Sequence, residues 1–302
     1  MSRNQHTLRT CHSFEGKGLH TGTYAHMKVM PAPAGHGIRF CRTDLPGSPV
    51  VDALAENVSN TARSTTISCG KAKAVTIEHI MSALTGLGVD NALIELDNQE
   101  VPILDGSAKP YVDAFLKEGL VDQDVPREYI DLPYALEIRD GKSGSWVRIE
   151  PADAPSAQVT ADFNSRVLGV QTARWDETVD YAREIGVCRT FCFFHEIEPL
   201  FRNNLIKGGD VDNAIVVVER PVGQEQLDYV AQLLGQPELH VENGYLSNLR
   251  LHFPDECGRH KLLDLLGDFR LAGGFLNARI TAFKPGHTIN TKAAKALRAL
   301  LK

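Results

Sequence analysis

The segment CGRHKLLDLLGDF (257–269) carries one histidine and two carboxylates at four-residue spacing inside a leucine-rich stretch. Its hydrophobic period predicts a helix from about residue 257 to residue 272. Because a helix turns about 100° per residue, His260, Asp264 and Asp268 lie along one line while the leucines cover the opposite side. A His and an Asp four residues apart are neighbours that can reach one ion. The polar line is therefore either a solvated face or part of a metal site.

A second predicted helix, TIEHIMSALTGLG (76–88), offers the missing ligand. Its apolar stripe consists of Ile77, Ile80, Met81, Leu84 and Leu87. Glu78 and His79 lie outside this stripe, either as a helix-start carboxylate with a surface histidine or as functional groups. With His260 and Asp264, His79 completes three nitrogen and oxygen ligands, the set typical of catalytic zinc. Glu78, next to a ligand, is then the expected general base, as in zinc proteases.

A third histidine stands in the turn KPGH (284–287), between a predicted strand and the last predicted helix. His287 alone is typical of a surface loop. Asp268 lies one helical turn beyond Asp264 and could hold an imidazolium at catalytic pH. Cys257 and His260 form a rival metal pair, but no second Cys/His pair completes it.

The composition is that of a globular protein, with 43% hydrophobic and 23% charged residues. The net charge of −6 argues against a nucleic-acid-binding protein, because such proteins normally have a basic surface. The N-terminus lacks the apolar stretch of a secretory signal, and no run approaches the roughly 20 apolar residues of a membrane span. The six cysteines are scattered without a CxxC pair, as in reduced cytosolic proteins. We therefore expect a cytoplasmic protein.

Two halves are expected on either side of the segment VDQDVPREYIDLP (121–133), which is charged, poor in apolar residues and contains two prolines. The predicted division is an N-terminal α+β domain over 1–122, a linker over 123–133 and a C-terminal α+β domain over 134–302. In each half, helices follow antiparallel-looking strands, which indicates an α+β duplication of packed sheet and helix layers.

Within the halves, local patterns predict further elements. Thr76 is the expected N-cap of the first helix and Ser107 that of a helix within 102–119. A helix is also predicted near 176–184. Strands are predicted over 91–98, 213–219 and 277–283, and a final helix over 291–302.

Long ordered motifs run through nearly the whole chain. They are FEGKGLHTG (14–22), NTARSTTI (60–67), TIEHIMSALTGLGVDNALIEL (76–96), PILDGSAKPYVDAF (102–115), CRTF (188–191), GGDVDNAIVVVE (208–219), RHKLLDLLGD (259–268) and FKPGH (283–287). On these motifs the chain closely resembles the UDP-3-O-acyl-N-acetylglucosamine deacetylase family, the zinc amidases of lipid A synthesis in Gram-negative bacteria.

The resemblance implies a two-domain βααβ sandwich with zinc in the cleft between the domains. It implies hydrolysis of the acetamide of UDP-3-O-acyl-N-acetylglucosamine to UDP-3-O-acyl-glucosamine and acetate. Fe²⁺ is an alternative to zinc, since the same ligand set also accepts iron. The other partner expectations are a monomer, no nucleic acid, and at most peripheral membrane contact through the acylated substrate.

The resemblance also assigns roles to single residues. His79, His260 and Asp264 become the zinc ligands. Glu78 activates the zinc-bound water, and Thr190 stabilises the oxyanion together with the metal.

Further roles concern the leaving group and the substrate. His287 assists the leaving amine, Asp268 orients His287, and Lys261 lies near the sugar and diphosphate. Phe163 and Lys284 match positions at the nucleotide end. The segment of the acyl-chain passage holds Phe191, Phe194, Ile197, Ile206, Val211 and Ala214.

Two other interpretations stay open. One is a zinc amidohydrolase of the same fold that acts on another acylated sugar or nucleotide. The other is a non-catalytic binding protein that keeps the fold, which the complete set of metal and proton-transfer residues disfavours.

Overall fold

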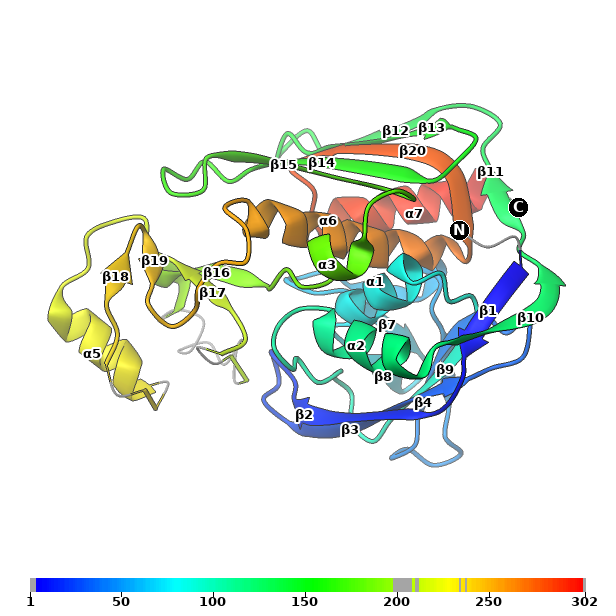
Figure 1. Ribbon diagram of the computed structural model, residues 1–302, viewed down its shortest axis with the longest axis horizontal. Helices are drawn as coiled ribbons and strands as arrows, with labels where there is room; N and C mark the ends of the chain where they lie inside the picture. The colour runs from blue at the N-terminus through cyan, green and yellow to red at the C-terminus, as the bar shows by residue number, and fades with distance from the viewer. Residues whose placement is uncertain (1–3, 198–207, 210–211, 234, 237, 301–302) are drawn as a thin grey trace.

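The computed structural model describes residues 4–197, 208–209, 212–233, 235–236 and 238–300. Two large sheets enclose a layer of helices, so the expected mixed α+β class is confirmed (Figure 1). The first sheet has the order β2 (His12–Lys17), β3 (Tyr24–Pro31), β9 (Ala92–Leu96), β4 (Ile38–Arg42) and β5 (Val50–Asp52). The second sheet has the order β12 (Leu136–Arg139), β13 (Trp146–Pro151), β20 (Phe275–Phe283), β14 (Ser156–Asp162) and β15 (Val170–Asp176), with β11 (Tyr129–Asp131) beside β20.

Both large sheets are mixed rather than purely antiparallel. In the first, β4 pairs with β9 in parallel, while β3 pairs with β9 antiparallel. In the second, β14 and β11 both run parallel to β20. The antiparallel appearance of the strands in the sequence was thus only partly right, because alternation of apolar residues does not reveal the direction of the neighbouring strand.

The layer between the sheets consists of helices from both halves of the chain (Figure 1). These helices are α1 (Glu78–Gly86), α2 (Lys109–Glu118), α6 (Glu256–Phe269) and α7 (His287–Leu300). One continuous apolar core joins the layers, from Phe40 and Ile94 in the first sheet through Ile80 and Leu265 in the helices to Ile280 in the second sheet.

A smaller unit extends from one end of the molecule, at the left of Figure 1. It contains β16 (Phe191–Phe193), β17 (Ile215–Val217), β19 (Tyr245–Leu246), β18 (Val241–Glu242) and α5 (Gln224–Leu233). Its own apolar cluster includes Val216, Leu227 and Val230. The helix α5 was not predicted from the sequence.

The remaining elements are short. They are β1 (Asn4–Leu8), β6 (Val58–Asn60), β7 (Thr66–Cys69), β8 (Ala72–Ala74), β10 (Leu120–Pro126), α3 (Tyr181–Glu184) and the 3₁₀ turns η1 (Ala55–Asn57) and η2 (Arg270–Ala272). The expected linker region is not irregular, since β10 pairs with β1 and β11 joins the second sheet.

Some local predictions were wrong because distant contacts decided them. Thr76 does not cap α1: its hydroxyl donates to the Glu100 carboxylate at 2.8 Å, and the helix begins at Glu78. Most of the helix predicted near 176–184 is absent, and only Tyr181–Glu184 forms a helix. Ser107 is not the N-cap of α2 either: the cap position is Ala108, although the Ser107 hydroxyl one residue earlier accepts from the backbone N–H of Lys109 at 3.0 Å.

The helices α1 and α6 approach each other unusually closely at Gly267. A Cβ atom at this position would lie 2.1 Å from the Glu78 carbonyl oxygen. Only glycine permits this separation of the two backbones. The contact places the first turn of α1, with its Glu78-His79 pair, against the polar line of α6.

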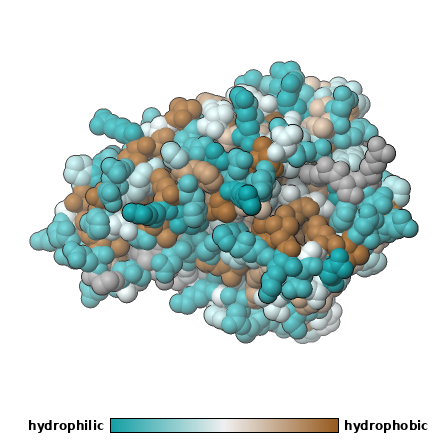
Figure 2. Space-filling view, in the orientation of Figure 1, coloured by the Kyte–Doolittle hydropathy of each residue, from teal (hydrophilic) through white to brown (hydrophobic). Residues whose placement is uncertain are grey.

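The outer surface carries a mixture of side chains. Hydrophilic side chains cover most of the face shown in Figure 2, with apolar side chains in smaller areas between them, as is usual for folded proteins. None of the helices in the described part of the chain combines the length and apolarity that a membrane span requires.

Candidate active site

The polar line of α6 is buried, so the interpretation as a solvated face is wrong. His260 and Asp264 are each 2% exposed and Asp268 is 0% exposed. Burying three ionisable groups on one helix is costly unless each has a partner. The partners come from α1, α7 and the loops around them.

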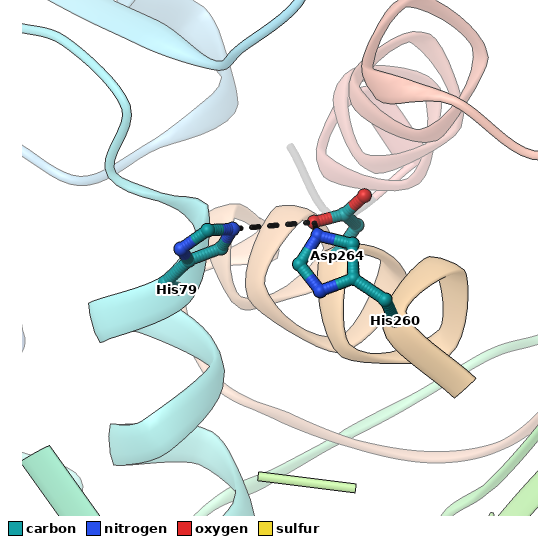
Figure 3. A group of neighbouring side chains, drawn as sticks. All are labelled: His79, His260 and Asp264. Atoms are coloured by element: carbon teal, nitrogen blue, oxygen red, sulfur yellow. Dashed lines mark ion pairs between the residues drawn. The ribbon is translucent and has the colours of Figure 1, made fainter. Parts of the chain in front are cut away.

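Three buried side chains from two helices converge on one point (Figure 3). His79 projects from α1, while His260 and Asp264 project from α6. One ligand atom from each lies within 4.8 Å of the other two. The Asp264 Oδ1 atom is 3.9 Å from His79 Nε2 and 3.4 Å from His260 Nε2. Among the described residues, this is the group of His, Cys, Asp and Glu side chains that could hold a metal ion.

The chemistry of these donors fits a zinc ion. Asp264 Oδ1 is buried without a hydrogen-bond partner among the described residues, which leaves its lone pairs for a cation. His260 donates from Nδ1 to the Cys188 carbonyl at 3.0 Å, so the lone pair of His260 Nε2 faces the site. Two imidazoles and one carboxylate are a common catalytic zinc set.

The protonation states also suit metal binding. Burial, followed by the charge of His260, lowers the pKa of His79 to about 3, and burial lowers the pKa of His260. Burial alone would raise the pKa of Asp264, but Lys261 and the imidazoles hold it below its usual range. Lys261 donates to Asp264 Oδ2 at 2.8 Å. The site therefore offers neutral imidazoles and an ionised carboxylate, the forms that bind metal.

A carboxylate and an imidazole lie beside the ligand group. His287 Nε2 is 3.8 Å from Glu78 Oε1. Burial raises the pKa of Glu78 to about 7. Burial by itself would lower the pKa of His287, but Asp268 and Glu78 together raise it to about 9. The pair can thus hold one acceptor and one donor of protons near neutral pH.

Asp268 lies behind His287 and accepts three hydrogen bonds. His287 Nδ1 and Asn290 Nδ2 each donate to Asp268 Oδ2 at 3.0 Å, and Thr65 Oγ1 donates to Oδ1 at 2.5 Å. Sequence reasoning missed Thr65 and Asn290. Thr65 belongs to the quoted motif NTARSTTI, whose position in the chain gave no sign of contact with α6.

The ligand group opens into a cavity of about 280 Å³. Of the residues singled out in the sequence, its lining includes the three candidate metal ligands, Glu78, His287, Thr190, Lys261, Phe163 and Phe191. Lys261 Nζ lies 5.4 Å from the centre of the Phe191 ring. The lining also includes residues that were not predicted to belong to the site, namely Leu19, Arg63, Thr76, Cys192, Phe193 and Glu196.

The remaining predicted substrate residues lie elsewhere. Phe194 lines a separate cavity of about 650 Å³ beside α5, and Ile197 is buried in the cluster under α5. The Ala214 carbonyl accepts from Asn248 Nδ2 at 3.2 Å, and Lys284 pairs with Asp162 at 3.2 Å.

Two further predicted positions, Ile206 and Val211, lie outside the described residues.

Comparisons with known proteins show to which family the chain belongs. The family model described as UDP-3-O-acyl N-acetylglycosamine deacetylase matches residues 5–232 and 239–299. The UDP-3-O-acyl-N-acetylglucosamine deacetylase of Xanthomonas oryzae pv. oryzae is 37% identical over 298 residues, which cover 98% of this chain and 90% of that protein. The protein of the same name from Trichormus variabilis is 37% identical, with coverage of 98% and 99%.

Longer relatives also match. The "Bifunctional enzyme LpxC/FabZ" of Porphyromonas gingivalis is 44% identical over 301 residues, which cover 99% of this chain and 65% of that protein. The chain thus spans just under two thirds of the bifunctional relatives' length. With a family match over nearly all its residues, the chain belongs to the UDP-3-O-acyl N-acetylglycosamine deacetylase family.

Proposed function

We propose that this protein is a zinc-dependent deacetylase of UDP-3-O-acyl-N-acetylglucosamine that acts in the cytoplasm in lipid A synthesis. It hydrolyses the acetamide to the free amine and acetate. The observation that carries the proposal is the buried group of His79, His260 and Asp264, which shares one cavity with Glu78 and His287.

In this proposal His79, His260 and Asp264 hold the zinc ion. When bound, the ion polarises the amide carbonyl and acidifies water. Fe²⁺ fits the same donors, because imidazole and carboxylate ligands are not selective between these metals.

The chain's own residues move the protons. The Glu78 carboxylate takes one proton from the water whose oxygen bonds to the acetyl carbon. As the carbon–nitrogen bond breaks, His287 Nε2 gives its proton to the leaving nitrogen, which becomes the free amine. The proton on Glu78 can then return to His287 across the 3.8 Å between their facing atoms. Such proton transfer contributes roughly 100-fold to 10,000-fold to a rate.

Three further residues support this chemistry. Thr190 lines the cavity and is proposed to stabilise the oxyanion. Lys261 also lines it and is proposed to lie near the sugar and diphosphate of the substrate. Asp268 contacts His287 rather than the cavity and is proposed to orient the imidazole.

Other residues are proposed to contact the two ends of the substrate. We propose that Phe163, which lines the cavity, and Lys284 contact the nucleotide end. Phe191 is the lining residue proposed to begin the acyl passage. Further acyl contacts are proposed for Phe194, Ile197, Ile206, Val211 and Ala214.

We also propose two domains, 1–122 and 134–302, joined by 123–133. The first large sheet lies wholly within the first range and the strands β12 to β15 and β20 within the second. Glu78 and His79 then come from one domain and the remaining ligands from the other, which makes the site an interdomain cleft. A monomer with no nucleic-acid partner and at most peripheral membrane contact completes the proposal.

One experiment tests the function. Purified protein is assayed for metal content and for acetate release from a series of UDP-3-O-acyl-N-acetylglucosamines and from non-acylated UDP-N-acetylglucosamine. We expect about one zinc per chain, activity that chelation abolishes and zinc restores, and much faster release from acylated substrates. Stoichiometric zinc with release only from a different acylated sugar would assign the protein to another amidohydrolase reaction. Zinc binding without any hydrolysis would indicate a non-catalytic binding protein that keeps the fold.

A further inference from the structure

Thr65 joins the proposed base to the residue that holds the proposed acid, through hydrogen bonds to Glu78 and Asp268. We infer that Thr65 is a positioning residue that fixes the distance between Glu78 and His287 by holding the carboxylates of Glu78 and Asp268 at the same time. This inference rests on the proposed function for the roles of Glu78 and His287, and on the hydrogen bonds below for the role of Thr65.

Thr65 binds a different carboxylate with each of its two donors. Its backbone N–H donates to Glu78 Oε2 at 3.0 Å, and its hydroxyl donates to Asp268 Oδ1 at 2.5 Å. Glu78 lies on α1 and Asp268 lies on α6, so a single residue links the two helices. Thr65 is 0% exposed, and water therefore does not compete for these bonds.

The two bonds complete a closed circuit of polar contacts. From Asp268, the circuit continues through Oδ2 to His287 Nδ1 at 3.0 Å. From His287, it returns across 3.8 Å between Nε2 and Glu78 Oε1. A shift of Asp268 would move the imidazole, while Glu78 would stay on its own helix. The hydroxyl of Thr65 therefore controls the separation of the proposed base and acid.

The chemistry of the residue suits this task. Two carboxylates near each other repel, and Thr65 adds a donor to each of them alongside the imidazole of His287. Asn290 also donates to Asp268, but among the described residues its amide forms no hydrogen bond to a second carboxylate. A β-branched side chain has few χ1 rotamers, so the direction of the Thr65 hydroxyl is restricted. Serine would keep the donor with less restriction, and valine would keep the shape without the donor.

The test compares Thr65→Val and Thr65→Ser in the full chain loaded with zinc. The matched control is Thr66→Val, the same change at the next buried residue, whose hydroxyl is outside the circuit. We expect Thr65→Val to lower kcat by about tenfold to a hundredfold with KM changed less than about twofold and zinc content unchanged. Thr65→Ser should recover most of the lost kcat, and Thr66→Val should match the unchanged protein.

A second measurement does not depend on turnover. Long-range ¹H–¹⁵N NMR of the imidazoles reports the hydrogen-bonded Nδ1 proton of His287. We expect this resonance to move upfield or broaden in Thr65→Val and to stay in place in Thr66→Val. Should Thr65→Val not fold, Thr65→Ala takes its place in both measurements.

Several outcomes would overturn the inference. Wild-type kcat in Thr65→Val, an equal loss in Thr65→Ser, or an unmoved His287 resonance would each show that the hydroxyl does not position the pair. A protein that releases no acetate even without substitution refutes the proposed function instead, and the NMR comparison still decides the role of Thr65.

Discussion

The contact between α1 and α6 gives the sharpest test of how the fold builds the candidate metal site. The substitution Gly267→Ala adds one methyl group at the crossing of the two helices. Its Cβ would lie 2.1 Å from the Glu78 carbonyl oxygen and 3.1 Å from the Ser82 backbone nitrogen. These are backbone atoms, which cannot rotate away as the end of a flexible side chain can. The helices must therefore separate, or α6 must turn.

The size of the effect follows from the geometry. To restore an ordinary contact, the two backbones must move apart by about 1 Å, and overpacking of this kind costs about 1–3 kcal/mol of unfolding free energy. The same movement carries His79 on α1 away from His260 and Asp264 on α6. A displacement of about 1 Å in a catalytic arrangement lowers rates about 100-fold. We also expect zinc to bind more weakly, because one ligand belongs to the displaced helix.

Three measurements check the expectation. Urea unfolding gives the loss of stability, competition with a chelator gives zinc affinity, and acetate release gives kcat/KM. The matched control is Gly141→Ala, a glycine whose added Cβ would have no atom within 4 Å. This control should change zinc affinity and kcat/KM by less than about twofold.

Two results would refute the reasoning. One such result is that Gly267→Ala and Gly141→Ala give the same stability, zinc affinity and kcat/KM. The contact between α1 and α6 would then accommodate the added methyl group without any measurable loss. A loss of stability with unchanged zinc affinity and rate would mean that the separation of α1 and α6 does not control the metal site.

Three more predictions concern Asp268, His260 and Glu100. Asp268→Asn removes the anion that contributes most to raising the pKa of His287 to about 9. The alkaline limb of the pH–rate profile, where loss of the His287 proton stops catalysis, should therefore move to lower pH. An unmoved limb would contradict this role of Asp268. His260→Ala should abolish stoichiometric zinc in the purified protein, and full retention of zinc, measured by plasma mass spectrometry, would remove His260 from the ligand set. Glu100→Ala leaves the buried hydroxyl of Thr76 without its acceptor. It should lower the unfolding free energy by about 1–3 kcal/mol, which calorimetry or urea unfolding can measure. Glu100→Gln should lower the unfolding free energy less.

Local patterns identified much of the chemistry in advance. Four-residue spacing placed His260 and Asp264 on one line of a helix, because the helical period depends only on the backbone. The apolar stripe of α1 left Glu78 and His79 free for another purpose. These patterns, together with the family motifs, sufficed to predict the candidate ligand set and the expected reaction.

Only the tertiary structure decided whether the polar line of α6 meets water or protein. The line is buried because α1, α7 and the Thr65 loop cover it, and no property of residues 257–269 reveals what covers them. The same holds for Thr76, whose hydroxyl turned to Glu100 instead of capping a helix. Periodicity is a local property of the chain, while burial and contact depend on segments far apart in sequence. For this reason the residue types of the site could be read from the chain, but the contacts that hold them at working distance came from the fold.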